Sequence, residues 1–171
     1  PDIVGVDVEQ RRVDFARREY APLPFERCRP DGLDFPDAAF DLVLSVVVLP
    51  FVPDDEAYLA EVRRVLRPGG HLVLATKTSP LLTRLWRRLT GRRALDRNPS
   101  PGIRHHDAGD AAALLRRHGF TILRRRAFYD PPFEARKNLV DLANGVVERV
   151  GEWAGLVAPA PYPLFLARRD D

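Results

Sequence analysis

Residues 40–76 constrain the fold of this chain more than any other segment. Residues 42–48 are apolar apart from one serine and rich in valine, which is typical of a strand buried on both faces in a parallel sheet. Residues 54–67 place apolar side chains at helical spacing, with acids at the start and arginines at the end, where each charge suits the helix dipole. The Pro-Gly-Gly at 68–70 ends that helix, and residues 71–76 form a second short apolar strand. The segment is therefore predicted to be a βαβ unit with parallel strands and a right-handed crossover.

Length and composition predict one globular domain. The chain has 171 residues, of which 45% are hydrophobic and 30% charged, enough to bury a core of its own. It contains neither an apolar run of membrane-spanning length nor a signal peptide at its start, so a cytoplasmic protein is expected. Its single cysteine, Cys28, excludes an internal disulfide and is predicted to be a small buried apolar residue.

The basic residues are spread over the chain. The formal net charge is only +3, and arginine doublets and triplets fall in several predicted helices. A nucleic-acid surface would gather them on one face, so solvated helix faces are the better interpretation. Residues 80–89 form a basic amphipathic helix, which is predicted to pack on the sheet edge. Peripheral contact with a membrane or with an acidic, lipid-like substrate is the alternative.

Further elements flank the central segment. They are predicted as strands at 3–8, 25–29, 120–127 and 162–168, and as helices at 9–20, 111–117 and 133–156. The chain is expected to be a single, partial domain over 1–171, with helical insertions at about 79–106 and 131–160.

Several of these motifs together resemble the second half of a class I S-adenosylmethionine-dependent methyltransferase of the small-molecule, type 11-like branch. They are Phe-Asp-Leu-Val at 40–43, the helix with an acidic start, Leu-Arg-Pro-Gly-Gly at 66–70, the apolar strand after it, and the Gly-Phe at 119–120 before a strand. The resemblance implies an α/β, Rossmann-like, doubly wound and mostly parallel sheet whose last strand is antiparallel. It also implies S-adenosylmethionine as cofactor and a small-molecule methyl acceptor.

The resemblance also implies a set of cofactor-binding residues. An acid at the end of the first strand here, Asp7, would accept hydrogen bonds from both ribose hydroxyls, as a carboxylate can. The alternative is that Asp7 only caps the next helix, and both roles are compatible. Asp31 with its neighbour Gly32 would meet the adenine edge, unless Asp31 is an ordinary turn aspartate. The full set is Asp7, Val8, Asp31, Gly32, Ser45 and Val46, the last two approaching the methionine half largely through backbone.

One part of the family pattern has no counterpart in this chain. The family begins with a strand and a glycine-rich turn that lies against the methionine moiety of the cofactor. Here the adjacent glycines, Gly69 and Gly70, follow a helix instead. In the resembling fold the missing strand lies centrally, between the strands at Ile3 and Leu42. The chain is therefore expected to lack an amino-terminal segment and to expose an apolar seam where the missing strand would pack. It is also expected to bind S-adenosylmethionine weakly or not at all, and to be inactive alone.

No catalytic residue and no metal site can be assigned from the sequence. Methyl transfer needs a general base only when the acceptor must lose a proton. His105, His106 and Tyr129 are candidates for that base, each with a surface or packing role as the alternative. Many relatives carry a histidine after the strand that here ends at Leu49, and this chain has Pro50 there.

Three other functions have less support in the sequence. A nicotinamide-binding domain would also use an acid such as Asp7, but residues 67–70 and the paired terminal strands fit it poorly. A non-catalytic, methyltransferase-like partner subunit would explain the lack of a glycine-rich turn. A nucleic-acid base methyltransferase is disfavoured, because residues 45–51 lack the Asn/Asp-Pro-Pro-aromatic sequence that holds a flipped base.

Overall fold

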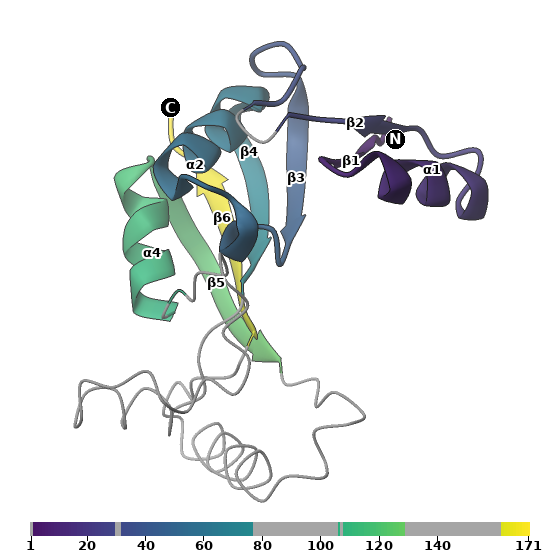
Figure 1. Cartoon of the computed structure of the whole chain (residues 1–171). Coiled ribbons are helices and arrows are strands. Elements are labelled where there is room, and N and C mark those ends of the chain that lie inside the picture. The colour runs from purple at the N-terminus through teal and green to yellow at the C-terminus, as the bar shows by residue number, and fades with distance from the viewer. Residues whose placement is uncertain (1, 30–31, 77–105, 107, 129–161) are drawn as a thin grey trace, which may run out of the picture.

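The structure, a computed structural model, describes residues 2–29, 32–76, 106, 108–128 and 162–171. Its elements in chain order are β1 (Gly5–Asp7), α1 (Gln10–Glu19), β2 (Phe25–Arg27), β3 (Phe40–Val46), a 3-10 turn (Leu49–Phe51), α2 (Asp55–Val65), β4 (Leu66–Ala75), α4 (Ala108–Arg117), β5 (Phe120–Phe128) and β6 (Tyr162–Arg169). Helices α2 and α4 cover the same face of the larger sheet (Figure 1). The helices predicted at 80–89 and 133–156 lie outside the described residues.

The larger sheet has the strand order β3-β4-β6-β5. Strands β3 and β4 are parallel, with Leu42 opposite His71 and Val46 opposite Ala75. Strand β6 lies antiparallel to both β4 and β5. The predicted βαβ unit and the antiparallel last strand are therefore confirmed, and the mixed sheet with helices on its face is the Rossmann-like arrangement expected.

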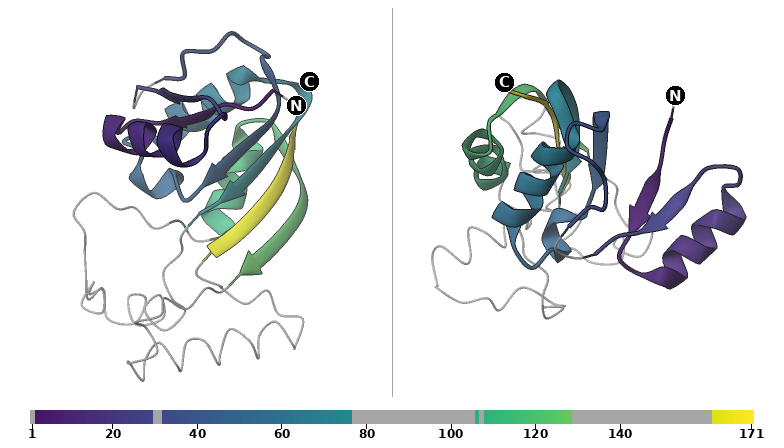
Figure 2. Two further views of the ribbon diagram at one scale, coloured as in Figure 1. Left: turned by 90° about the vertical axis from the view of Figure 1, so that its right-hand side faces the viewer. Right: turned by 90° about the horizontal axis from the view of Figure 1, so that it is seen from above.

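The first two strands form a separate sheet. Strands β1 and β2 pair in parallel, and neither pairs with β3. Figure 2 shows the β1–α1–β2 unit standing apart from the four-stranded sheet. No strand in the described part of the chain lies between β1 and β3, which agrees with the predicted gap. The apolar seam is exposed as well, since Val6 is 41% and Leu44 66% accessible to solvent.

The prediction that β3 is buried on both faces is wrong. Leu42, Leu44 and Val46 alternate along the strand and are all exposed, whereas Val43 and Ser45 face the helices and are covered. The physical reason is position, because β3 is the edge of its sheet and no described element packs on the opposite face. Helix α1 also has an apolar side chain that no described element covers, since Val13 is buried but Phe15 is exposed.

The α2–β4 junction departs from the predicted boundaries. Asp54 is the N-cap of α2, and its carboxylate accepts hydrogen bonds from the backbone N–H groups of Glu56 and Ala57. The helix ends at Val65, and β4 begins at once with Leu66, so the Pro-Gly-Gly lies inside the strand and not before it. Regular pairing with β3 nevertheless resumes only at His71.

The glycines explain that irregular start of β4. Gly69 has a φ of 75°, in the left-handed region that glycine tolerates. A Cβ on Gly70 would lie 2.8 Å from the carbonyl oxygen of Arg67. Both positions therefore require glycine.

The core lies between the larger sheet and its two helices. Its buried members come mainly from α2, α4 and strands β4, β5 and β6, and include Leu59, Val62, Leu74, Leu115 and Phe165, whereas β3 contributes only the partly buried Val43. None of the described helices is both long enough and apolar enough to span a membrane.

Cys28 is half-buried and not fully buried as predicted. Its backbone N–H donates to the carbonyl of Asp7 at the end of β1. Burial, helped by the nearby carboxylates of Asp7 and Asp34, raises the pKa of the Cys28 thiol. At neutral pH the thiol therefore stays protonated and a poor nucleophile.

Candidate functional site

The carboxyl ends of β3 and β4 form one rim of the larger sheet, where ligands bind in open α/β folds. Strand β3 continues into Val47, whose N–H donates to the carbonyl of Ala75 at 2.8 Å. Strand β4 continues into Thr76, which is fully buried and whose hydroxyl oxygen has no partner among the described residues. Helix α2 begins just after β3, and His106 lies just before α4. We call this region the carboxyl rim.

Ser45 and Val46, both predicted to bind the cofactor, lie on opposite faces at this rim. Ser45 is only 2% exposed, and its hydroxyl is 2.7 Å from that of Tyr58 on α2. Burial raises the pKa of Tyr58, which therefore stays neutral. The side chain of Ser45 is thus committed to the helix layer, and that of Val46 is exposed on the other face. Their predicted approach to a ligand through backbone remains a prediction.

Val47 carries backbone strain that the sequence did not indicate. Its φ is 55°, a conformation that is rare for a β-branched residue and costs about 1–3 kcal/mol. Such strain is concentrated at functional sites. A glycine or asparagine here would have suggested a positive φ, but a valine within an apolar run suggests only strand.

We expect Val47→Gly to be tolerated far better than the same change in regular strand. Glycine relieves the strain at φ 55°. The unfolding free energy of Val47→Gly should therefore be at least about 1 kcal/mol higher than that of Val43→Gly. Val43, in regular pairing within β3, is the matched control. Urea unfolding measures both, and equal losses would contradict the strain at Val47.

Asp7 ends β1, as predicted, and its carboxylate already has local contacts. Oδ1 accepts the backbone N–H of Glu9 at 2.8 Å, so the helix-entry role of Asp7 is present. Oδ2 lies 3.7 Å from the guanidinium of Arg12, beyond hydrogen-bond distance. The neighbouring Val8 is exposed, and its carbonyl accepts from Arg27. Asp7 thus retains capacity to accept a hydrogen bond from a ligand.

The loop after Gly32 is fixed by α2, and Asp31 itself lies outside the described residues. Arg64 donates to the carbonyls of Leu33 and Phe35 and to the carboxylates of Asp37 and Glu61, at 2.7–3.0 Å. Glu61 in turn accepts the N–H of Leu33 at 3.1 Å. From the sequence, only an interaction of Arg64 with the helix dipole could be predicted. A contact with a loop so far away in the chain leaves no pattern in the neighbouring residues. The network raises the pKa of Arg64 and lowers that of Glu61.

This network should make stability depend on pH. Arg64 holds the pKa of Glu61 below its ordinary value, so the pair stabilises the fold above about pH 4.5 and this stabilisation is lost as the pH falls through the lowered pKa. We therefore expect Glu61→Gln to lose less stability than the parent between pH 6 and about pH 3. Glu19→Gln, a change at an exposed residue of α1, should behave like the parent in the same denaturant titrations. If the unfolding free energies of the parent and of Glu61→Gln fall equally between pH 6 and about pH 3, the expectation is contradicted.

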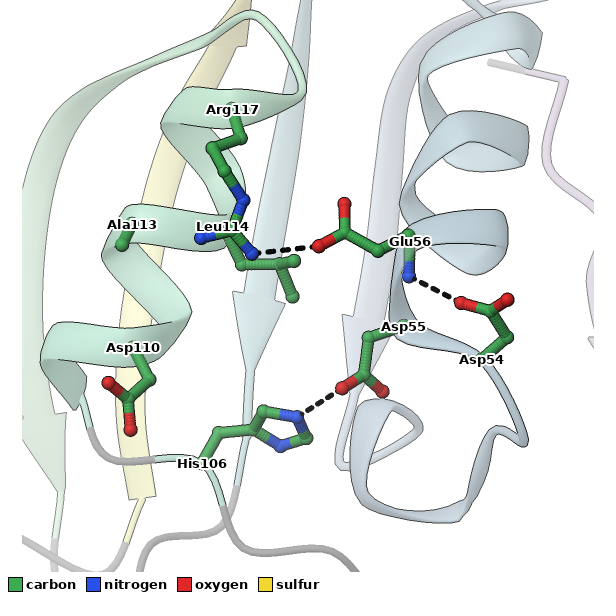
Figure 3. Close-up of a pocket in the computed structure, with 8 residues that line it drawn as sticks. All are labelled: Asp54, Asp55, Glu56, His106, Asp110, Ala113, Leu114 and Arg117. Atoms are coloured by element: carbon green, nitrogen blue, oxygen red, sulfur yellow. Dashed lines mark hydrogen bonds and ion pairs between the residues drawn. The ribbon is translucent and has the colours of Figure 1, made fainter.

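A pocket of about 330 Å³ lies between the amino end of α2 and helix α4 (Figure 3). Its lining residues are Asp54, Asp55, Glu56, His106, Asp110, Ala113, Leu114 and Arg117. Asp55 pairs with His106 at 2.6 Å, and Glu56 pairs with Arg117 at 2.8 Å and with His118 at 2.5 Å. Arg117 and then His118 lower the pKa of Glu56. The acidic start of α2 thus contacts residues at both ends of α4.

Of the three predicted candidates for a general base, only His106 lies among the described residues. His105 and Tyr129 fall outside them. Within the described part of the chain, no group of three or more His, Cys, Asp or Glu side chains is arranged to hold a metal ion.

The segment from β1 to β4 matches a known protein family. The family profile described as "Methyltransferase domain" matches residues 1–74. Residues 1–74 of this chain are therefore similar to methyltransferases. The resemblance seen in residues 40–76 is thereby confirmed.

Curated relatives align with less than half of this chain. The fatty-acid O-methyltransferase of Mycolicibacterium smegmatis is 39% identical over 71 residues, which cover 40% of this chain and 26% of the relative. The ubiquinone biosynthesis O-methyltransferase of Paramagnetospirillum magneticum is 36% identical over 78 residues, covering 43% and 31%. The demethylmenaquinone methyltransferase of Tropheryma whipplei is 32% identical over 81 residues, covering 46% and 34%. The aligned segments thus span only a quarter to a third of these relatives.

Solved structures share the fold of this chain over nearly its whole length. An S-adenosylmethionine-dependent methyltransferase from Mesorhizobium loti superimposes with a TM-score of 0.62 at 24% identity, covering 97% of this chain and 79% of the other. A 1,6-didemethyltoxoflavin-N1-methyltransferase from Burkholderia thailandensis gives a TM-score of 0.60 at 22% identity, covering 99% and 62%. At these identities the likeness establishes the fold alone.

S-adenosylmethionine is the cofactor of this family, and the described residues fit one end of it. Asp7 offers a partly exposed carboxylate oxygen at the carboxyl end of β1, which suits a ribose diol. Gly32 begins a loop held rigidly by Arg64. Ser45, by contrast, offers no side-chain group, because its hydroxyl is bound to Tyr58.

Proposed function

We propose that a protein containing this chain transfers a methyl group from S-adenosylmethionine to a small, partly apolar acceptor. The observation that carries the proposal is the carboxyl rim, where the strained Val47, the buried Thr76 hydroxyl and the Asp55–His106 pair follow adjacent strand ends. Asp7 ends β1, which pairs in parallel with β2 in the other sheet. A fold that gathers polar groups at strand ends is suited to bind a nucleoside-type cofactor there.

Methyl transfer depends mainly on the alignment of the reacting groups. The cofactor supplies a methyl group on a positively charged sulfur, and the acceptor atom must attack in line with the leaving sulfur. Residues of this chain would hold the two partners: Asp7 the ribose, the backbone at Ser45 and Val46 the methionine half, and the loop at Gly32 the adenine. The rigid Arg64 network would keep that loop in place.

The acceptor class is proposed from the relatives. The names of the aligned proteins describe methylation of a fatty acid and enzymes of menaquinone and ubiquinone biosynthesis. Long apolar acceptors agree with the exposed apolar side chains Leu42, Leu44 and Val46 on the open face of β3. We therefore propose an acceptor that joins one nucleophilic group to an apolar body.

Label transfer tests this function. The protein purified from its natural source would be incubated with S-adenosylmethionine carrying a tritiated methyl group and with a panel of fatty acids, quinols and simple phenols. Label in an organic extract supports the proposal, and label in none of the acceptors, with intact cofactor recovered, contradicts it. Loss of transfer in Asp7→Ala, with transfer retained in Glu19→Ala at an exposed residue of α1, would assign Asp7 to the cofactor.

A non-catalytic, methyltransferase-like partner subunit is the second candidate. Two observations favour it: β1 and β3 lie in separate sheets, and the hydroxyl of Ser45 and one oxygen of Asp7 are already bound within the chain. A partner subunit would copurify with an active enzyme and raise that enzyme's methyl transfer without binding the labelled cofactor itself. Photocrosslinking with labelled S-adenosylmethionine distinguishes the two candidates by which chain takes the label.

A further inference from the structure

His106 and Asp55 form a partly buried carboxylate–histidine pair at the carboxyl rim. Nε2 of His106 lies 2.6 Å from Oδ2 of Asp55, and the two side chains are 11% and 18% exposed. Asp55 is the first residue of α2, where the helix dipole stabilises its negative charge. The ionised carboxylate can only accept, so it places a proton on Nε2 and leaves the lone pair on Nδ1. The pair thus fixes one tautomer of His106.

Nδ1 of His106 is buried and has no hydrogen-bond partner among the described residues. Figure 3 shows this nitrogen facing away from Asp55. A buried acceptor without a partner is costly, and native proteins rarely leave one unused. Nδ1 of His106 can therefore accept a hydrogen bond from one donor, such as a hydroxyl.

A second unpartnered group lies at the same rim. The hydroxyl oxygen of Thr76, just after β4, is also buried without a partner in the described part of the chain. The backbone N–H of Thr76 is in contrast bound to the carbonyl of Pro163. Thr76 thus offers a second buried oxygen, after the end of β4, that can still take part in a hydrogen bond.

We propose that His106, oriented by Asp55, is the general base for the methyl acceptor, and that the reacting group of the acceptor is a hydroxyl. This inference rests on the proposed methyl transfer. In the reaction the acceptor O–H gives its proton to Nδ1 while an oxygen lone pair forms the new O–CH3 bond. The C–S bond breaks with its electron pair left on sulfur, so the sulfonium becomes a neutral thioether. His106 ends as an imidazolium paired with Asp55.

The surroundings favour that product state. Asp54, Asp55 and Glu56 from α2 and Asp110 from α4 line the same pocket, opposed by the single cation of Arg117. Their excess negative charge stabilises the imidazolium formed by proton transfer. A carboxylate acceptor would need no such base, which is why the inference selects hydroxyl acceptors, phenols above all, within the proposed class.

His118 supplies a matched control. It too pairs with a carboxylate, that of Glu56 at 2.5 Å, but Glu56 is exposed and His118 does not line the pocket. His118→Gln therefore removes a histidine–carboxylate pair just beyond the other end of α4 and leaves the Asp55–His106 pair in place. Circular dichroism of His106→Gln and His118→Gln would establish that both variants are folded.

The test uses the 171-residue chain and 4-nitrophenol, whose phenolate absorbs visible light and whose phenol does not. Just below neutral pH the parent and His118→Gln should raise the phenolate absorbance, and His106→Gln should reduce that rise about tenfold or more. Nitrogen-15 NMR should show that the neutral form of the His106 ring carries its proton on Nε2. An Nδ1–H tautomer, no rise with the parent, or an equal rise with His106→Gln overturns the proposal and leaves the pair as a structural link between α2 and α4.

The same variants separate this inference from the proposed function. In the protein from its natural source, His106→Gln should lower methyl transfer to 4-nitrophenol about 100-fold below neutral pH, with a smaller loss at high pH where the phenolate forms unaided. If the parent converts 4-nitrophenol to phenolate but transfers no label to any acceptor, the methyltransferase function fails while His106 stands as a base. If the parent and His106→Gln transfer the label with the same pH profile, the methyltransferase function stands and His106 is not the base.

Discussion

Phe165→Ala should destabilise the fold by about 3–5 kcal/mol, the usual cost of removing a fully buried phenylalanine. Phe165 lies mid-way along β6, opposite Leu74 of β4 and Arg125 of β5, and has no exposed surface. The guanidinium of Arg125 lies 5.6 Å from the centre of its ring, and this cation–π contact is lost as well. Because β6 is inserted between β4 and β5, a cavity at Phe165 weakens both pairings.

Urea denaturation followed by circular dichroism measures the effect. Domains of this size have about 5–15 kcal/mol of stability, so Phe165→Ala should remain folded or lie near its midpoint in buffer. Phe165→Leu, with a smaller cavity, should lose less and keeps the comparison measurable if the alanine variant unfolds. Leu123→Ala, at an exposed position of β5, should change stability by no more than about 0.5 kcal/mol. Similar losses in all three variants would refute the buried placement of Phe165.

The 171-residue chain on its own should bind S-adenosylmethionine at least about 100-fold more weakly than the micromolar level, which corresponds to a loss of about 3 kcal/mol. Its predicted ribose contact, Asp7, and its predicted methionine contacts, Ser45 and Val46, lie in two sheets that do not pair. Binding would have to bring these sheets together first, and that ordering cost is subtracted from the affinity. The exposed seam of Val6, Val8, Leu42 and Leu44 shows that the sheets are not already packed together.

Isothermal titration calorimetry measures this affinity. Saturable micromolar binding to the isolated chain is the result that contradicts the expectation. ATP, which shares the adenosine moiety but lacks the methionine group, is the control for weak binding of any nucleotide. If S-adenosylmethionine and ATP give the same small heats, the chain alone does not hold the methionine half.

The candidate site shows which kind of information the sequence carries. Asp7, Ser45 and Val46 could be placed at strand ends because strands, caps and glycine turns have local signals in residue type and spacing. The roles of Arg64 and Asp55 could not, since each depends on a residue or loop far along the chain. For Arg64 the partners are carbonyls at 33 and 35, and a backbone carbonyl has no residue-type signal at all.

Local sequence by itself determined the βαβ unit at 40–76 and the capped start of α2, because propensity, capping and apolar spacing all act between near neighbours. The antiparallel end of the sheet followed only from the family resemblance. Tertiary structure alone decided that β3 is an exposed edge, that β1 and β2 form their own sheet, that Val47 adopts a positive φ, and that His106 meets Asp55. The physical reason is that burial and pairing depend on which segments lie beside one another in space. An apolar strand has the same sequence whether its second face is covered or open to solvent.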